Sequence, residues 1–242
     1  MRHFKVNTLI GLGVEEFPTG ILAAGALLQY LYDTQKTDLE HFTHISPYLT
    51  SKYMLLDSST RRNLELTETL REKQKRGSLL WVLDKTKTAM GGRLLRNYIE
   101  QPLIDKEEME KRLDAIQELN QDSISRDEIR EYLNPVYDLE RLLSKVTYKT
   151  ANPRDLIAFR NSLQMLPPIK TVLAGFQKEE LAAIREEIDG LEDIYQLIDE
   201  AIVEEPPISI REGGMIKDQF DETIDHLRAA KHDGKQWLVQ LE

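Results

Sequence analysis

Nine prolines divide the chain into segments in which apolar residues recur at steps of three and four. Such steps bring apolar side chains to one face of an α-helix. Proline fits the first turn of a helix and breaks its interior, so the prolines mark element boundaries. The sequence therefore predicts a mainly α protein, a multi-helix domain with long helices and one or two short strands.

The longest apolar pattern predicts one helix of about 25 residues whose narrow stripe is close to a coiled-coil seam. The stripe consists of Leu181, Ile184, Ile188, Leu191, Ile194, Ile198 and Ile202. Pro206-Pro207 ends the helix. Residues 208–210 then alternate like a short strand, and Gly213-Gly214 marks a turn. We expect this helix to pack lengthwise on a partner helix.

Further helices are expected from Pro18 to Lys36 and over residues 88–101. Residues 53–56 are a short apolar run ending at Asp57, which indicates a strand or another extended segment. All three segments fit a predominantly helical chain.

Start signals place the remaining helices. Asp105 is an N-cap candidate with Glu108 three residues later, which is a capping-box pattern. Asn152 before Pro153 repeats the start signal, and a last helix begins near Asp221. That last helix has no stop signal, as expected of a piece of a longer chain. The buried face predicted for the helix after Asp105 is Met109, Leu113, Ile116 and Leu119.

Charge is distributed unevenly along the chain, whose net charge is −10. Residues 179–205 contain 11 acidic residues and one basic residue. Residues 61–96 contain 10 basic and 4 acidic residues, a local charge of +6. A basic stretch is either a solvated helix face or a nucleic-acid footprint. The acidic window would repel phosphate, so strong autonomous DNA binding is not expected.

Motifs for chemistry are missing from the sequence. A phosphate loop would need glycine where Ala229 stands, five residues before the Gly234-Lys235 pair. His41 and His44 form a close pair, but no third ligand completes a metal spacing. The absence of cysteine excludes disulfides and thiolate metal sites. We therefore expect no enzyme activity and no catalytic, cofactor-binding or metal-binding residue in this chain.

Several ordered motifs cover nearly the whole chain. They are Met54-Leu-Leu-Asp-Ser-Ser-Thr-Arg-Arg-Asn-Leu-Glu-Leu66, Thr88-Ala-Met-Gly-Gly-Arg-Leu-Leu-Arg96, Gln101-Pro-Leu103, Asp138-Leu-Glu-Arg-Leu142, Ala151-Asn-Pro-Arg-Asp-Leu156 and Ile210-Arg-Glu-Gly-Gly214. In order and spacing they closely resemble the core domain of the MutS family of DNA mismatch-repair proteins.

The resemblance implies a division into three parts. Residues 1–45 are the end of the connector domain and the link into the core, residues 46–220 are the helical core (lever) domain, and residues 221–242 start the helix leading to the clamp domain. Such a domain mechanically couples DNA clamping to a distant ATPase domain in mismatch repair.

The resemblance also implies the partners of a full-length parent, expected to be a DNA-dependent ATPase. That parent would bind ATP and Mg, mismatched duplex DNA and a MutL-type repair protein. It would form a homodimer, and the chain would contact the connector, clamp and ATPase domains. A cytoplasmic location without membrane contact is expected, because the apolar runs are shorter than the roughly 20 residues of a membrane span.

Two alternatives remain open at this point. Besides the lever domain of a repair protein, one alternative is an autonomous, sequence-nonspecific duplex-binding module that uses residues 61–96, and the other is the core of a MutS paralogue acting in recombination. The candidates for DNA contact are Arg61, Arg62, Lys73, Lys75 and Arg76.

Residues that carry the resemblance are expected to have structural roles. They are Asp57, Arg61, Arg62, Asn63, Gly91, Arg93, Pro102, Asp138, Arg141, Pro153, Arg154, Asp155, Gly213 and Gly214. Ion pairs inside the domain are predicted for Arg93 and Arg154, and Gly91-Gly92 is predicted to permit a close helix crossing or a kink. Lys149 and Gln219 stand where the family usually has glycine, which leaves the local turn geometry at these two positions open.

Overall fold

The computed structural model describes residues 3–6, 8–35, 39, 42–47 and 49–230. The chain divides into two compact units, Met1–Leu55 and Leu56–Glu242. Across the described residues the regular structure is helical, without a sheet, and an isolated antiparallel bridge joins Ile202 to Ile216. The prediction of a mainly α protein is confirmed.

The first unit contains the helix α1 (Pro18–Gln35) and two short 3-10 helices, η1 (Ile10–Leu12) and η2 (Thr50–Lys52). Pro18 opens α1 as predicted, because a proline costs no hydrogen bond in the first turn of a helix.

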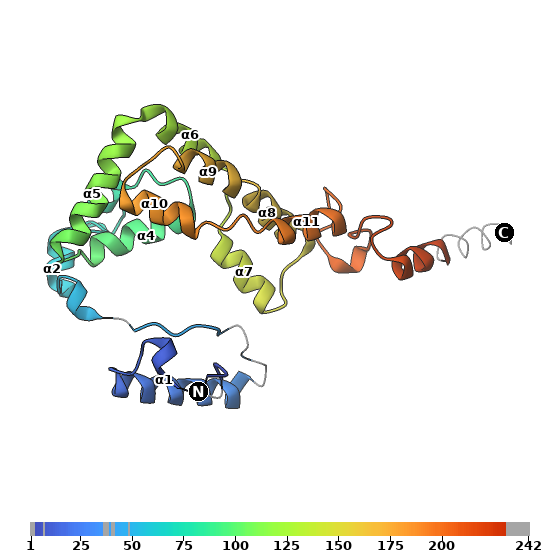
Figure 1. Ribbon diagram of the computed structural model, residues 1–242, viewed down its shortest axis with the longest axis horizontal. Helices are drawn as coiled ribbons and strands as arrows, with labels where there is room; N and C mark the ends of the chain where they lie inside the picture. The colour runs from blue at the N-terminus through green and yellow to red at the C-terminus, as the bar shows by residue number, and fades with distance from the viewer. Residues whose placement is uncertain (1–2, 7, 36–38, 40–41, 48, 231–242) are drawn as a thin grey trace. The chain divides into compact units, whose positions relative to one another are not determined.

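Figure 1 shows the helices of the second unit in their order along the chain. They are α2 (Ser58–Asn63), α3 (Leu79–Leu83), α4 (Ala89–Glu100), α5 (Lys106–Gln121), α6 (Ser123–Leu133), α7 (Leu139–Thr147), α8 (Pro153–Leu163), α9 (Leu166–Leu173), α10 (Glu179–Glu187) and α11 (Glu192–Ala201), followed by the 3-10 helix η3 (Ile210–Glu212). Residues 222–230 are helical too. The Asp221 carboxylate accepts the Ile224 N–H at 3.0 Å, which confirms the predicted start. Residues 231–242, to which that prediction also extends, lie outside the described residues.

Side-chain caps explain where most of these helices start. The Asp105 carboxylate accepts the N–H groups of Glu107 and Glu108. Asn152 and Asp155 bind each other's backbone N–H groups in a complete capping box. The helix starts predicted at Asp105 and Asn152 are confirmed. The other capping side chains of the α-helices described above are Asp57, Ser78, Thr88, Asp122 and Asp138.

Three apolar clusters divide the second unit into three groups of helices. The α4 packet contains α3, α4 and the residues flanking α2, the α5 packet contains α5, α6, α9 and α10, and the α8 packet contains α7, α8 and α11. The buried residues of the α4 packet are Leu66, Leu80 and Ile99. Those of the α5 packet are Ala115, Ile169, Leu173, Phe176 and Leu181. Those of the α8 packet are Leu142, Ile157, Phe159, Leu163, Ile198, Ala201 and Ile202.

The single long helix predicted over residues 181–202 is wrong, because the chain forms α10 and α11 with a break between them. Glycine in a helix costs about 1 kcal/mol relative to alanine, which weakens the helix at Gly190. The Asp189 carboxylate accepts the Leu191 N–H at 3.0 Å and so competes with helical bonding. α10 packs on α5 and α9, whereas α11 packs on α8.

The short strand predicted over residues 208–210 is also wrong, because the chain enters η3 there. Gly213 and Gly214 both have left-handed φ angles, 74° and 72°, and form the predicted turn. Gly213 combines its φ with a ψ of −174°, a conformation that is essentially restricted to glycine. Beyond the turn the chain runs back beside α11, and the Val203 N–H donates to the Met215 carbonyl at 3.0 Å.

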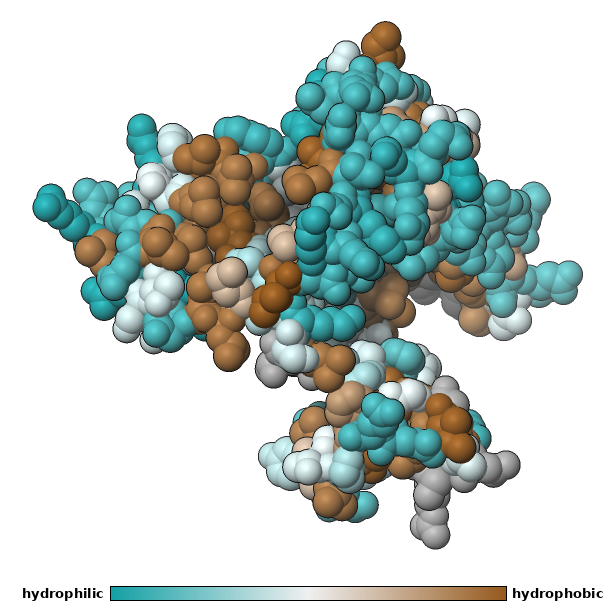
Figure 2. Space-filling model, turned by 60° about the vertical axis from the view of Figure 1, so that its left-hand side comes forward, coloured by the Kyte–Doolittle hydropathy of each residue, from teal (hydrophilic) through white to brown (hydrophobic). Residues whose placement is uncertain are grey.

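The buried face predicted for α5 is wrong in most of its members. Leu113 and Ile116 are 63% and 60% exposed, and Met109 is exposed too, whereas Ala115 is buried. The small Ala115 lets the side chains of α9 and α10 fill this core, which turns the larger apolar residues outward. Figure 2 shows apolar side chains gathered at the surface beside a larger hydrophilic area.

No helix within the described ranges is long and apolar enough to cross a membrane.

Candidate functional site

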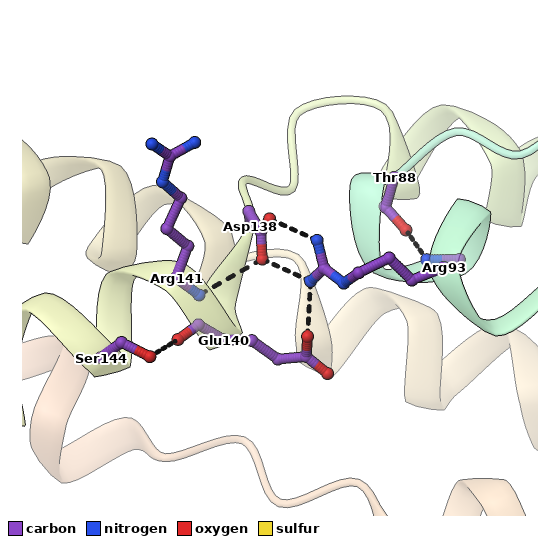
Figure 3. Close-up of polar contacts among 7 residues, drawn as sticks. Thr88, Arg93, Asp138, Glu140, Arg141 and Ser144 are labelled. Atoms are coloured by element: carbon purple, nitrogen blue, oxygen red, sulfur yellow. Dashed lines mark hydrogen bonds and ion pairs between the residues drawn. The ribbon is translucent and has the colours of Figure 1, made fainter.

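Polar contacts join the helix packets, and we take these joints as the candidate functional site. The first joint connects α4 to α7 (Figure 3). The Arg93 guanidinium donates two parallel hydrogen bonds to Asp138, at 2.7 and 2.8 Å, and a third to Glu140. The Asp138 carboxylate also caps α7. Because Arg93 donates to it, the pKa of Asp138 is below its ordinary value. The planar fork fixes direction as well as distance between the two packets.

The other signature residues at this joint act through the backbone or point away. The Arg141 N–H donates to Asp138 at 3.3 Å, while its guanidinium points away from the cluster (Figure 3). Gly91 lies inside α4, and a Cβ there would sit 3.1 Å from the Thr88 hydroxyl. The close approach is therefore to the preceding cap, not to the crossing helix or kink that the sequence suggested. Pro102 follows the end of α4.

The α4 packet also contacts the α5 packet. The Arg112 guanidinium lies 3.9 Å from the centroid of the Tyr98 ring. Arg130 donates to the Lys85 carbonyl at 3.2 Å. The α4 packet is thus held to both of its neighbours by arginine contacts.

A buried arginine holds the α8 packet together internally. Arg160 on α8 is 6% exposed and donates to Asp199 at 2.8 Å and to Glu204 at 2.7 and 2.8 Å. Hydrogen bonding from Arg160 lowers the pKa of Glu204, and that from Glu204 raises the pKa of Arg160. Two carboxylates of the acidic window therefore compensate a cation that would otherwise be costly to bury.

Sequence analysis missed Arg160, although a signal was present. It stands among Leu156, Phe159 and Leu163, the apolar residues of α8, where a lone charge requires partners. The acidic window of residues 179–205 supplies those partners.

The turn between α7 and α8 gathers further signature residues. Lys145 donates to Asp155 at 2.7 Å, and Pro153 occupies the first turn of α8. Burial raises the pKa of Asp155, but the Asn152 N–H and Lys145 lower it, and the net result is below the ordinary value. Lys149 adopts the left-handed φ of 56° that glycine would favour. A lysine therefore holds a backbone conformation here that glycine adopts more readily.

Arg154 makes a different contact from the one predicted. Its Nε donates to the Pro206 carbonyl at 3.0 Å, so it holds the segment after α11 through the backbone and not through an ion pair. Gln219, the other position where glycine is usual, has a φ of 68° and is also left-handed.

The candidate DNA contacts lie on α2 and in the loop after it. Arg61, Arg62, Lys73 and Arg76 are exposed. Lys75 forms an ion pair with Asp84, and with Thr86 it lowers the pKa of that carboxyl to about 2.

Asn63 closes α2, and Asp57 caps its start by accepting the Thr60 N–H at 2.6 Å. The hydrogen bond from the Thr60 backbone lowers the pKa of Asp57. The His41 of the histidine pair lies outside the described residues. In the described part of the chain, no group of three or more histidine, aspartate and glutamate residues is placed to hold a metal ion.

Comparison with known proteins gives two family matches and several close relatives. Residues 59–240 match the family model of MutS domain III, and residues 1–45 match that of MutS domain II. The chain is 62% identical over 240 residues to the DNA mismatch repair protein MutS of Lachnoclostridium phytofermentans, covering 99% of this chain and 26% of the relative. It is 50% identical over 240 residues to that of Ruminiclostridium cellulolyticum, with 99% and 27% covered. It is 49% identical over 242 residues to that of Halothermothrix orenii, with 100% and 27% covered. The chain thus spans about a quarter of the length of these relatives.

Proposed function

The chain belongs to the MutS family of DNA mismatch repair proteins, and from that premise we propose that it serves as the core, or lever, domain of a longer protein. In that role it couples DNA clamping mechanically to an ATPase domain that lies outside the matched domains II and III. We assign residues 1–45 to the end of the connector, 46–220 to the lever and 221–242 to the helix leading to the clamp.

The proposed partners follow from the names of the relatives and from the family. The longer protein binds mismatched duplex DNA, hydrolyses ATP with Mg, forms a homodimer and contacts a MutL-type repair protein in the cytoplasm. Because the relatives are named as mismatch repair proteins, repair is favoured over a role in recombination.

The joint between Arg93 and Asp138 is the observation that carries the proposal. It connects α4 to α7, which belong to different packets and are 45 residues apart in sequence, through a bidentate contact. A lever must transmit a displacement from one group of helices to the next. A directional contact fixes the relative position of the two groups better than apolar packing does.

Variants of the longer protein test this role. Arg93→Met removes the joint, and we expect ATP binding and DNA binding to persist while stimulation of ATP hydrolysis by mismatched duplex falls several-fold. Arg96→Met is the matched control, because Arg96 pairs with Glu100 inside the same helix. Equal stimulation in the two variants would contradict the proposal.

The alternative, an autonomous duplex-binding module, is tested on the chain itself. We expect no binding below micromolar concentrations when the fluorescence anisotropy of a labelled duplex, with or without one G·T mismatch, is measured at low salt. Equal binding of both duplexes with a steep salt dependence would instead assign residues 61–96 to phosphate contact. A preference for the mismatch would place recognition within this chain.

A further inference from the structure

Helices α8 to α11 form a helical hairpin whose two arms break at the same level (Figure 1). One arm is α8 followed by α9, and the other is α10 followed by α11, with α8 packed on α11 and α9 on α10. The first arm breaks before Pro167-Pro168, and the second breaks over residues 188–191. A Cβ on Gly190 would lie only 3.7 Å from the Pro167 ring, so the two breaks are neighbours.

An open pocket of about 320 Å³ lies at this level. Its lining comes from both arms and consists of Leu163, Gln164, Pro167, Gly190, Glu192, Tyr195 and Gln196. Protein interiors are otherwise close-packed, so this is a level at which side chains have space to rearrange.

The two apolar cores lie on opposite sides of the breaks. Ile188 packs with the core of the α5 packet, whereas Leu191 packs with that of the α8 packet. In the other arm, Leu163 packs with the core of the α8 packet and Met165 with that of the α5 packet, while Leu166, the first residue of α9, packs with the α8 packet again. The change from one core to the other therefore falls at the break in the second arm and is spread over residues 163–166 in the first.

The hydrogen bonds that hold the chain at the second break are bonds that water can also form. Lys170 donates to the Ile188 carbonyl at 2.6 Å, and Asp189 binds the Leu191 N–H. Leu191 has a left-handed φ of 48°, which is unfavourable for a leucine, and α11 starts there without a side-chain cap. The apolar stripe from Leu181 to Ile202 nevertheless keeps helical spacing through the break.

We infer that this hairpin is a hinge with two discrete arrangements. One is the interrupted form of this structure, in which residues 188–191 separate α10 from α11, and in the other these residues are helical and α10 and α11 join into one helix. The interrupted form strains Leu191, whereas the continuous form places Gly190 inside a helix, and these opposing costs are similar in size. The hinge would also give the lever its two positions, and that consequence alone rests on the proposed function.

Distance measurement between paired labels tests the hinge in the chain itself. The chain has no cysteine, so cysteines introduced at Ala183 and Glu200 are the only labelling sites. Both residues are exposed, one on α10 and one on α11. In a continuous helix their Cα atoms lie about 25 Å apart, and the non-helical residues between α10 and α11 give a different distance in the form of this structure. We expect pulsed electron paramagnetic resonance to show both populations.

Gly190→Ala shifts the balance in a known direction. A Cβ fits at Gly190 without a close contact, so the interrupted form tolerates alanine, while the helix propensity of the continuous form rises. The ratio of the population at the continuous-helix distance to the population at the other distance should increase about fivefold. Leu191→Gly relieves the left-handed strain and should shift the ratio the other way.

Two controls separate the hinge from general effects. Labels at Gln117 and Ala183 both lie in the α5 packet and should give one distance that Gly190→Ala leaves unchanged. Gly25→Ala in α1 stabilises a helix elsewhere and should not alter the distance between labels at 183 and 200. A single distance that neither hinge variant changes would overturn the inference. Because ATP hydrolysis is not measured, this result is independent of the lever role.

Discussion

Lys149→Gly should stabilise the protein although it removes a whole side chain. Lys149 follows the end of α7 with a φ of 56°. Its N–H donates to the Val146 carbonyl at 2.9 Å, and the Thr150 N–H donates to the Lys145 carbonyl at 2.8 Å. This is the Schellman pattern, in which the left-handed position is usually glycine.

The expected gain follows from two opposing terms. A left-handed conformation costs a residue with a Cβ about 1–2 kcal/mol. Glycine recovers this cost but makes the unfolded chain more flexible, which removes about 0.4–1 kcal/mol. The Lys149 side chain is exposed and makes no hydrogen bond or ion pair among the contacts of the described residues. The net stabilisation is therefore about 0.5–1 kcal/mol, which raises Tm by about 1–4 °C in a chain of this size.

Urea denaturation followed by circular dichroism measures this difference. Tyr148→Gly is the matched control, because Tyr148 has an ordinary φ of −81° and gains nothing from glycine. We expect the midpoint to rise for Lys149→Gly and to fall for Tyr148→Gly. If Lys149→Gly were neutral or destabilising, the left-handed geometry would not carry the cost assigned to it.

Three further outcomes are expected. Arg160→Met should lower the free energy of unfolding by about 1.5–3 kcal/mol, the range for hydrogen bonds to charged groups. An unchanged urea midpoint would contradict the stabilising role assigned to the buried Arg160. Asp84 has its pKa lowered from 3.8 to about 2 by Lys75 and Thr86, so its stabilisation is present above pH 3.8 and lost as the pH falls toward 2. The Asp84→Asn variant should not show that loss of stability when its unfolding is followed at decreasing pH. Ala115→Leu should destabilise by about 1–3 kcal/mol whereas Ile116→Gln stays within about 0.5 kcal/mol, and the reverse order in thermal melts would contradict the orientation of α5.

Local signals predicted much of the fold. The caps at Asp105 and Asn152 are contacts within three residues, so the sequence contains all the information needed to place them. The turn at Gly213-Gly214 is equally local, because its backbone conformation itself requires glycine.

Features that depend on partners in space were missed. The apolar stripe from Leu181 to Ile202 has helical spacing, but spacing does not say whether its residues pack into one core or into two. The break at Gly190 could therefore not be predicted from the periodicity. The prediction that Leu113 is buried was wrong for a similar reason, because packing against α9 and α10 determines which face of α5 is buried. Arg160 was overlooked because its carboxylate partners are about 40 residues away.

The α5 and α8 packets are separate in space but interleaved in sequence. The chain completes neither core before residue 179, because α10 belongs to one packet and α11 to the other. A truncation or a proteolytic cut in the loop between α9 and α10 would therefore leave both cores without a helix at once. A cut within residues 188–191 would instead remove α11 alone, so that one fragment keeps every helix of the α5 packet and the α8 packet is left incomplete.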